Sequence, residues 1–330
     1  MEDRSRAALT QTKGYGTALV GTILWSTAAV FIRYLTVEYE MPPLVLAFWR
    51  EVGVALGLVT AILLVKPRLL HVSRRLVPYF ILYGLVLMIF NVTWTLSVAL
   101  NGAAVSTVLV YSSPAVTAIL AWRFWQERLD GIKITAILLS LTGCILVSEA
   151  FDSAIWQVNP VGIVLGLASG ILFAIYSIFG KEAVRRGVNP WTSLTYTFLF
   201  APFFLLLLLI VPIEERLNLN LGQFSELMWL GRSWSGWGVL LLLALGPTIG
   251  GYGLYSVSMR NLPASVANLI ASTEPVYTAI LAYLFLGERL HGIQIIGSFM
   301  ILAGVVFLRL QNGRISRVQF IAKRNPPSNG

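Results

Sequence analysis

Glu274 is the acidic residue whose position in the sequence points most directly to chemistry. It lies in an apolar run, 264–286, and we take it as the only acidic residue near the centre of such a run. Low dielectric disfavours the charged form of a carboxyl, so an ionisable group at membrane depth indicates function by default. Glu274 could bind an amine or cation, exchange a proton, or serve as a neutral or ion-paired structural carboxyl. Arg50 is a candidate partner, for which the adjacent Glu51 competes.

Two prolines, Pro114 and Pro275, fall near the middle of two apolar runs. Because proline lacks an N–H, the carbonyls of Val110 and Ala271 lose their usual helical donors. A matched pair of interrupted helices at the midplane is typical of a transporter site. The structural alternative is a tolerated kink that a neighbouring hydroxyl satisfies.

Polar and aromatic side chains share helical faces around these breaks, at 100° per residue. The residues that we expect to bind substrate are Glu274, Asn268, Ser272, Tyr111, Ser113, Asn91, Trp94, Tyr252, Tyr255, Trp25 and Tyr176. Aromatic stripes also arise from packing alone, whereas Asn91 and the tyrosine hydroxyls need polar partners at lipid depth. Since no Lys or Arg lies on these faces, we expect an aromatic, neutral cavity.

Apolar helices must position these residues. The 330 residues are 57% hydrophobic and 12% charged, about half the charge of a soluble domain. A bilayer core needs roughly 20 apolar residues per span. The sequence offers ten such runs: 14–35, 43–65, 77–98, 103–125, 131–150, 160–180, 191–212, 236–258, 264–286 and 292–310. We predict an all-α membrane protein with ten transmembrane helices, which excludes a soluble enzyme and a nucleic-acid-binding module.

The basic residues indicate how the chain is oriented. With the N-terminus inside, 19 of the 24 Lys and Arg residues fall in inner segments and four in outer ones. Cytoplasmic loops carry such an excess. We therefore expect both termini in the cytoplasm and the chain in the plasma (inner) membrane.

An internal repeat is the most specific signal in the chain. Residues 103–147 align without a gap to 264–308, at an offset of 161, with 17 identities in 45 positions. Thr117-Ala-Ile-Leu-Ala matches the same five residues from Thr278. Each half therefore has five spans, and because five is odd, the second copy is inverted. Inverted repeats build carriers with a site near the midplane.

The five-plus-five plan, the two Pro-x-x-Thr-Ala-Ile-Leu-Ala helices and the two Glu-Arg-Leu-x-Gly-Ile loops resemble the EamA-type transporters of the drug/metabolite transporter superfamily. The resemblance covers about residues 14–310 and implies transport of a small metabolite, often export. The first copy departs from the pattern, since Trp125-Gln126 stands where the second has Leu286-Gly287. From the residues alone we read the Glu-Arg-Leu loops as structural.

The predicted organisation is a cytoplasmic N-terminus (1–13), two five-helix repeats (14–150 and 160–310) and a disordered cytoplasmic tail (311–330). One cysteine and two histidines make a metal centre or catalytic triad improbable, and we expect no cofactor, catalytic residue or nucleic-acid partner. Small-residue spacings such as Gly162-x-x-x-Gly166 indicate close helix contacts, within a monomer or in a homodimer.

We predict a secondary transporter that moves an amino-acid-like or other small amphipathic solute, with export favoured. It would work by alternating access and could be proton-linked. The alternatives are an exporter of lipophilic cations, with Glu274 as the counter-charge, and a channel subunit.

Overall fold

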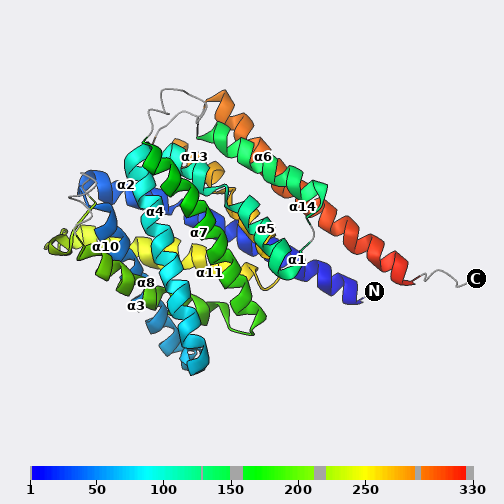
Figure 1. Cartoon of the computed structure of the whole chain (residues 1–330), viewed down its shortest axis with the longest axis horizontal. Helices are drawn as coiled ribbons and strands as arrows, with labels where there is room; N and C mark the ends of the chain where they lie inside the picture. The colour runs from blue at the N-terminus through cyan, green and yellow to red at the C-terminus, as the bar shows by residue number, and fades with distance from the viewer. Residues whose placement is uncertain (1, 128, 149–158, 212–220, 287–290, 325–330) are drawn as a thin grey trace, which may run out of the picture.

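The computed structural model describes residues 2–127, 129–148, 159–211, 221–286 and 291–324. Within these ranges every regular element is a helix (Figure 1). The first half comprises α1 (Glu2–Ser26), α2 (Ala28–Glu38), α3 (Pro43–Val65), α4 (Val77–Val110), α5 (Ser113–Trp125) and α6 (Gly131–Val147). The second comprises α7 (Pro160–Arg185), α8 (Pro190–Leu209), α10 (Trp234–Leu243), the π-helical turn η4 (Ala244–Thr248), α11 (Ile249–Ser258), α12 (Ala264–Ala271), α13 (Glu274–Leu286) and α14 (Gly292–Arg324).

Eight stretches of the described residues are long and apolar enough to cross a membrane. Each corresponds to one of the ten predicted spans. The other two predicted spans, 131–150 and 264–286, correspond to the 17-residue α6 and to the pair α12 and α13, which contain 8 and 13 residues. The fold is therefore an all-α membrane fold in which the predicted span 131–150 is short, and 264–286, like 103–125, is interrupted next to its proline.

The repeat that the sequence predicts reappears in the helix boundaries. In the first half a helix ends at Val110 and the next runs from Ser113 to Trp125. In the second half the equivalent helices end at Ala271 and run from Glu274 to Leu286. These boundaries differ by the same 161 positions as the aligned sequences. Local sequence around each proline therefore sets the break in both copies.

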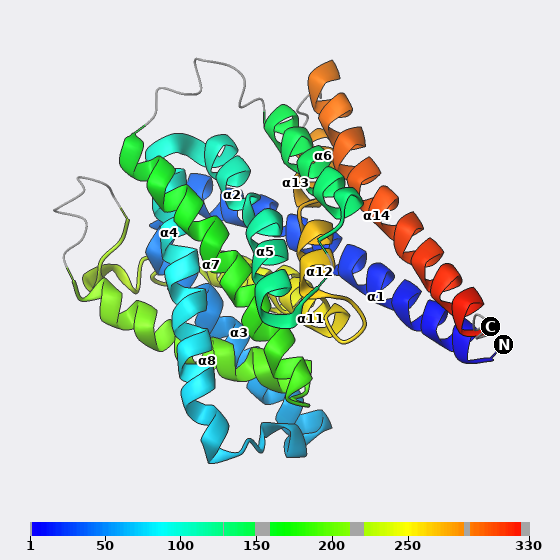
Figure 2. The same cartoon turned by 45° about the vertical axis from the view of Figure 1, so that its right-hand side comes forward.

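The helix α4 joins two predicted spans, 77–98 and 103–125, that we expected a turn to separate. Its backbone is helical from Val77 to Val110, yet the hydroxyls of Ser97 and Ser106 lie 2.8 Å apart. Nine residues of straight helix would separate them by about 13.5 Å along the axis. The helix axis therefore bends sharply between these serines, as the upper end of α4 shows in Figure 2. The bend reverses the direction of the chain, as a turn between two separate helices would.

Both ends of the described chain lie at the same end of the molecule (Figure 2). There α1 contacts α14, with the Arg309 guanidinium 5.6 Å from the centre of the Tyr15 ring. The helix α14 continues to Arg324, whereas we predicted a disordered tail from residue 311. The sequence explains the difference, since no proline interrupts it before Pro326.

Glycines bring α7 against the bent helix α4. A Cβ at Gly166 would lie 2.5 Å from a methyl carbon of Leu109, and one at Gly170 would lie 2.9 Å from the Leu109 carbonyl oxygen. The predicted contacts of small residues thus occur here within one chain, directly beside the break after Val110. By contrast, Gly246 has open space where a Cβ would be.

Gly170→Ala is expected to lower the melting temperature of the purified protein in detergent. Its methyl group would collide with backbone, which cannot rotate away as a side chain can, and such overpacking costs about 1–3 kcal/mol. Differential scanning fluorimetry would measure the shift. Gly246→Ala is the matched control, because it adds the same methyl group in open space and should leave the melting temperature unchanged or slightly raised.

Candidate functional site

The two helix breaks are joined by a hydrogen bond between the repeats. Tyr111 lies in the two-residue break between α4 and α5, and Glu274 is the first residue of α13. The Tyr111 hydroxyl donates to the carboxylate of Glu274. Tyr111 is buried and Glu274 is half-buried. Tyr111 of the first repeat therefore holds the carboxylate of Glu274, which stands in the second repeat where the first has Ser113.

A second polar path connects four helices beside this contact. Ser113 of α5 donates to Oδ1 of Asn268 at 3.0 Å, and Nδ2 of Asn268 donates to Ser177 of α7 at 2.9 Å. The Ser177 hydroxyl in turn shares a 2.7 Å hydrogen bond with the Tyr255 hydroxyl of α11. Asn268 is completely buried. Three of the predicted site residues thus belong to one continuous chain of hydrogen bonds, which Ser177 completes.

The predicted aromatic residues gather around Tyr252. Ring centroids lie 4.3 Å apart for Trp25 and Tyr252, and 5.7 Å apart for Tyr176 and Tyr252. Trp25 also lies 6.0 Å from Tyr255. The α-helix is interrupted at Thr27, between α1 and α2 and two residues after Trp25, and the π-helical turn η4 precedes Tyr252.

The surroundings of Tyr252 are not neutral, and our prediction of a neutral lining is wrong. Glu51 of α3 is completely buried and accepts a hydrogen bond from Nδ2 of Asn91. Charges on Arg50, Glu51 and Glu274 all act on the Tyr252 hydroxyl. Glu274 is therefore not the only acidic residue at depth. Arg50 and Glu51, two adjacent charges in an apolar run, are the sequence signal for this charged lining, but they lie on α3, which carries none of the predicted site residues.

Ser272 and Trp94 lie apart from these contacts. The Ser272 hydroxyl shares a 2.6 Å hydrogen bond with Ser140 of α6, and Sγ of Cys144 lies 3.8 Å from the Ser272 carbonyl oxygen. Ser272 therefore joins α12 to α6. Trp94 is half-buried against the main hydrophobic core. Sequence periodicity placed Trp94 on the correct helix and put Ser272 in a span whose helix breaks at that residue, and it identified the neighbour of neither.

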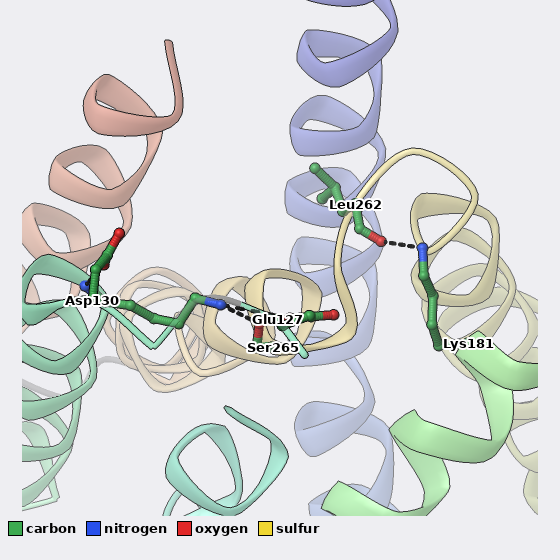
Figure 3. A network of polar contacts seen from close by, with 6 residues as sticks. Glu127, Asp130, Lys181, Leu262 and Ser265 are labelled. Atoms are coloured by element: carbon green, nitrogen blue, oxygen red, sulfur yellow. Dashed lines mark hydrogen bonds and ion pairs between the residues drawn. The ribbon is translucent and has the colours of Figure 1, made fainter. Parts of the chain in front are cut away.

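One Glu-Arg-Leu loop links the two repeats. Nζ of Lys133 lies 3.5 Å from the Glu127 carboxylate and donates to Ser265 of α12 at 3.1 Å, and Ser265 donates to Glu127. Lys181 of α7 donates to the carbonyls of Met259 and Leu262 in the turn before α12. Figure 3 shows Glu127 and Ser265, and the contact of Lys181 with Leu262, near one end of α12. We call Glu127, Lys133, Ser265 and Lys181 the latch.

The other end of the molecule cannot form the same latch. At the offset of 161, Lys133 corresponds to Gln294 and Ser265 corresponds to Ala104. Neither residue supplies the ammonium or hydroxyl group. Glu288, the counterpart of Glu127, lies outside the described residues. The sequence therefore allows the latch, with its hydrogen bonds between the repeats, at one end only.

The described residues contain no group of three or more His, Cys, Asp and Glu side chains that could hold a metal ion. The polar groups that converge are instead two carboxylates, an arginine, amides and hydroxyls. Such groups can bind charged or hydrogen-bonding solutes and can exchange protons.

Comparison with known proteins identifies the family. The EamA-like transporter family matches residues 12–149 and again residues 160–310. The chain therefore belongs to this family and contains two EamA domains. A solved crystal structure covering 94% of this chain and 99% of its own shares the fold, with a TM-score of 0.71 and 17% sequence identity.

Curated relatives that align with this chain over most of their own length are named as transporters. An uncharacterized transporter of Bacillus subtilis, YwfM, is 24% identical over 88% of this chain and 91% of its own. A probable amino-acid metabolite efflux pump of Escherichia coli is 26% identical over 87% of this chain and 92% of its own. These likenesses support a multi-pass membrane transporter of small molecules, and they point away from an enzyme.

Proposed function

We propose that the chain is a secondary carrier that exports a small amino-acid-like metabolite by alternating access. The observation that carries the proposal is the hydrogen bond between Tyr111 and Glu274, which joins the broken helices of the two repeats. In inverted-repeat carriers, one repeat rocks against the other around a site at such breaks. A contact between the two breaks can change when either repeat moves. The similarity to a probable amino-acid metabolite efflux pump supports the substrate class.

Glu274 is the proposed coupling carboxyl, and the aromatic cluster around Tyr252 is the proposed substrate site. Glu274 is half-buried among apolar helices, so gain or loss of a proton changes its interaction with Tyr111. A proton-linked cycle would use that change to favour one orientation of the repeats. The second candidate, export of a lipophilic cation, uses the same carboxylate as a counter-charge.

The latch supports a state in which one end is closed. Lys133 of α6 and Glu127, whose side chains are only 11% and 15% exposed, form an ion pair within the first repeat, and both hydrogen-bond to Ser265 at the start of α12. Opening that end would separate Ser265 from both charged groups and expose them to water. We place the latch on the cytoplasmic side, because the inner segments contain 19 of the 24 Lys and Arg residues.

This orientation predicts opposite accessibility for two introduced cysteines. In a Cys144→Ala background, Ser5→Cys should react with an impermeant maleimide only after the cells are opened, and Ser225→Cys should react in intact cells. Ser225 is exposed and follows the seventh predicted span. Labelling of both positions from the same side would contradict an even number of spans with both termini in the cytoplasm.

Counterflow in proteoliposomes tests the proposed function. Vesicles preloaded with an unlabelled amino acid should accumulate the labelled form transiently, because a carrier exchanges solute across the membrane. Accumulation of a lipophilic cation alone would support the second candidate. A flux that rises without saturation and shows no counterflow would indicate a channel.

A further inference from the structure

Unsatisfied polar atoms cluster beside Tyr252, outside the Glu274 contact. Within the described residues, five buried side-chain polar atoms lack a hydrogen-bond partner. Two of them, Nε of Arg50 and Oε2 of Glu51, belong to neighbouring residues of α3 whose charges act on Tyr252, and a third is the hydroxyl of Tyr176, whose ring centroid lies 5.7 Å from that of Tyr252. A buried polar group without a partner costs about 1–3 kcal/mol, and more when it is charged. Such a concentration at one place indicates that a ligand completes the hydrogen bonds.

Arg50 and Glu51 carry opposite charges but do not neutralise each other by contact. They are neighbours on α3, where successive side chains point about 100° apart. Among the described residues, no ion pair joins Arg50 to Glu51 or to Glu274, although the charge of Arg50 acts on Glu51. Asn91 holds only the other oxygen of Glu51. One free cationic donor and one free carboxylate oxygen therefore remain near the Tyr252 hydroxyl.

A zwitterion supplies the two groups that this arrangement lacks. The carboxylate of an α-amino acid would accept from the Arg50 guanidinium, whose planar fork suits carboxylates. The ammonium group, one carbon away, would donate to Oε2 of Glu51. Trp25, Tyr176 and Phe198 surround Tyr252 and offer rings against which an apolar side chain can pack. A cation without a carboxylate would leave Arg50 unpaired.

We propose that Arg50 and Glu51 form a head-group subsite that binds the carboxylate and ammonium of a zwitterionic amino acid, with its side chain among the rings around Tyr252. The proposal rests on the proposed carrier function, and it names residues distinct from the coupling carboxyl Glu274. It favours the amino-acid class over lipophilic cations.

The test uses three probes that differ only in the head group: L-phenylalanine, its methyl ester and 3-phenylpropionate. Stabilisation of the detergent-purified protein against heat reports binding, and counterflow reports transport. The full chain should bind the zwitterion most tightly. Loss of a charge-assisted hydrogen bond corresponds to about tenfold or more in affinity. Arg50→Gln should therefore weaken the zwitterion and 3-phenylpropionate by that factor and spare the ester. Glu51→Gln should weaken the zwitterion and the ester but spare 3-phenylpropionate.

Controls separate a failed fold from a failed proposal. Arg232→Gln removes the same charge from an exposed site and should change none of the three affinities. Arg50→Lys keeps the charge without the planar fork, and it should bind the zwitterion with intermediate affinity. Equal weakening of all three probes, or unchanged zwitterion affinity in Arg50→Gln, overturns the subsite while leaving the carrier function in place. If the wild-type chain exchanges no amino acid in a wide screen, the proposed function and the subsite both fail.

Discussion

Glu274→Gln is expected to abolish the pH dependence of net transport in proteoliposomes. Glutamine keeps the size of the side chain and can still accept a hydrogen bond from Tyr111, but it cannot ionise. Without a proton to load and release, net transport should stay at its basal rate at every pH tested between about pH 5 and pH 8. Exchange of substrate for substrate can survive, since exchange does not require the empty carrier to reorient. Net flux and counterflow measured on the same vesicles would separate an effect on net transport from an effect on exchange.

Tyr111→Phe is the matched variant for this experiment. It removes the hydroxyl that donates to Glu274 and keeps the buried ring. Net transport by this variant should still change with pH, because the ionisable group remains. If Glu274 instead serves as the counter-charge for a cation, Glu274→Gln should weaken binding and exchange together. Normal pH-dependent net transport in Glu274→Gln would contradict both roles and leave a structural carboxyl.

Loss of the latch is expected to open the end of the molecule at which it lies, the proposed cytoplasmic end. Glu127→Gln removes the charge that Lys133 contacts at 3.5 Å and weakens the hydrogen bond from Ser265. A buried interaction of this kind contributes about 1.5 kcal/mol or more, which corresponds to roughly a tenfold shift in a two-state equilibrium. A cysteine at the buried Ala267 of α12, in a Cys144→Ala background, would report the opening. Its reaction rate with N-ethylmaleimide should rise by about that factor.

Glu182→Gln is the matched control for the latch. Glu182 also forms ion pairs, with Arg185 and Arg186 at 3.7 and 2.9 Å, but all three residues lie at the end of α7 and these pairs do not join the repeats. Exposed pairs within one helix contribute little. The reaction rate at Ala267→Cys should therefore stay the same in Glu182→Gln. Equal rates in the wild-type background and in Glu127→Gln would mean that the latch does not hold that end closed.

The repeat shows how far sequence reasoning reaches in this protein. The ungapped alignment at an offset of 161 predicted two equivalent broken helices, and the structure breaks both before Pro114 and Pro275. These features follow from local covalent chemistry, because proline lacks a donor wherever it lies in a helix. The membrane fixes the lengths of the apolar runs in a similarly local way. Family membership followed from the same motifs.

The partners of the site residues were decided by the tertiary structure. The sequence put Tyr111 and Glu274 on comparable faces, but their direct contact depends on how two helices 163 residues apart are rotated against each other. Ser272 was predicted on the same kind of face and meets α6 instead. Periodicity defines a face to within about a quarter turn, whereas a hydrogen bond needs its atoms placed within a few tenths of an ångström.

The charged residues illustrate the same division. The sequence contained Arg50 and Glu51 inside an apolar run, yet only the packed fold brought their charges close enough to act on Tyr252 and joined Glu51 to Asn91 by a hydrogen bond. Glu127 lies in a loop close in sequence to Lys133, and only the fold brought Ser265 of the other repeat to this pair. The sequence by itself determined the helices, their breaks, the repeat and the family. The tertiary structure decided which polar groups meet, because contacts between distant segments depend on the crossing and rotation of whole helices.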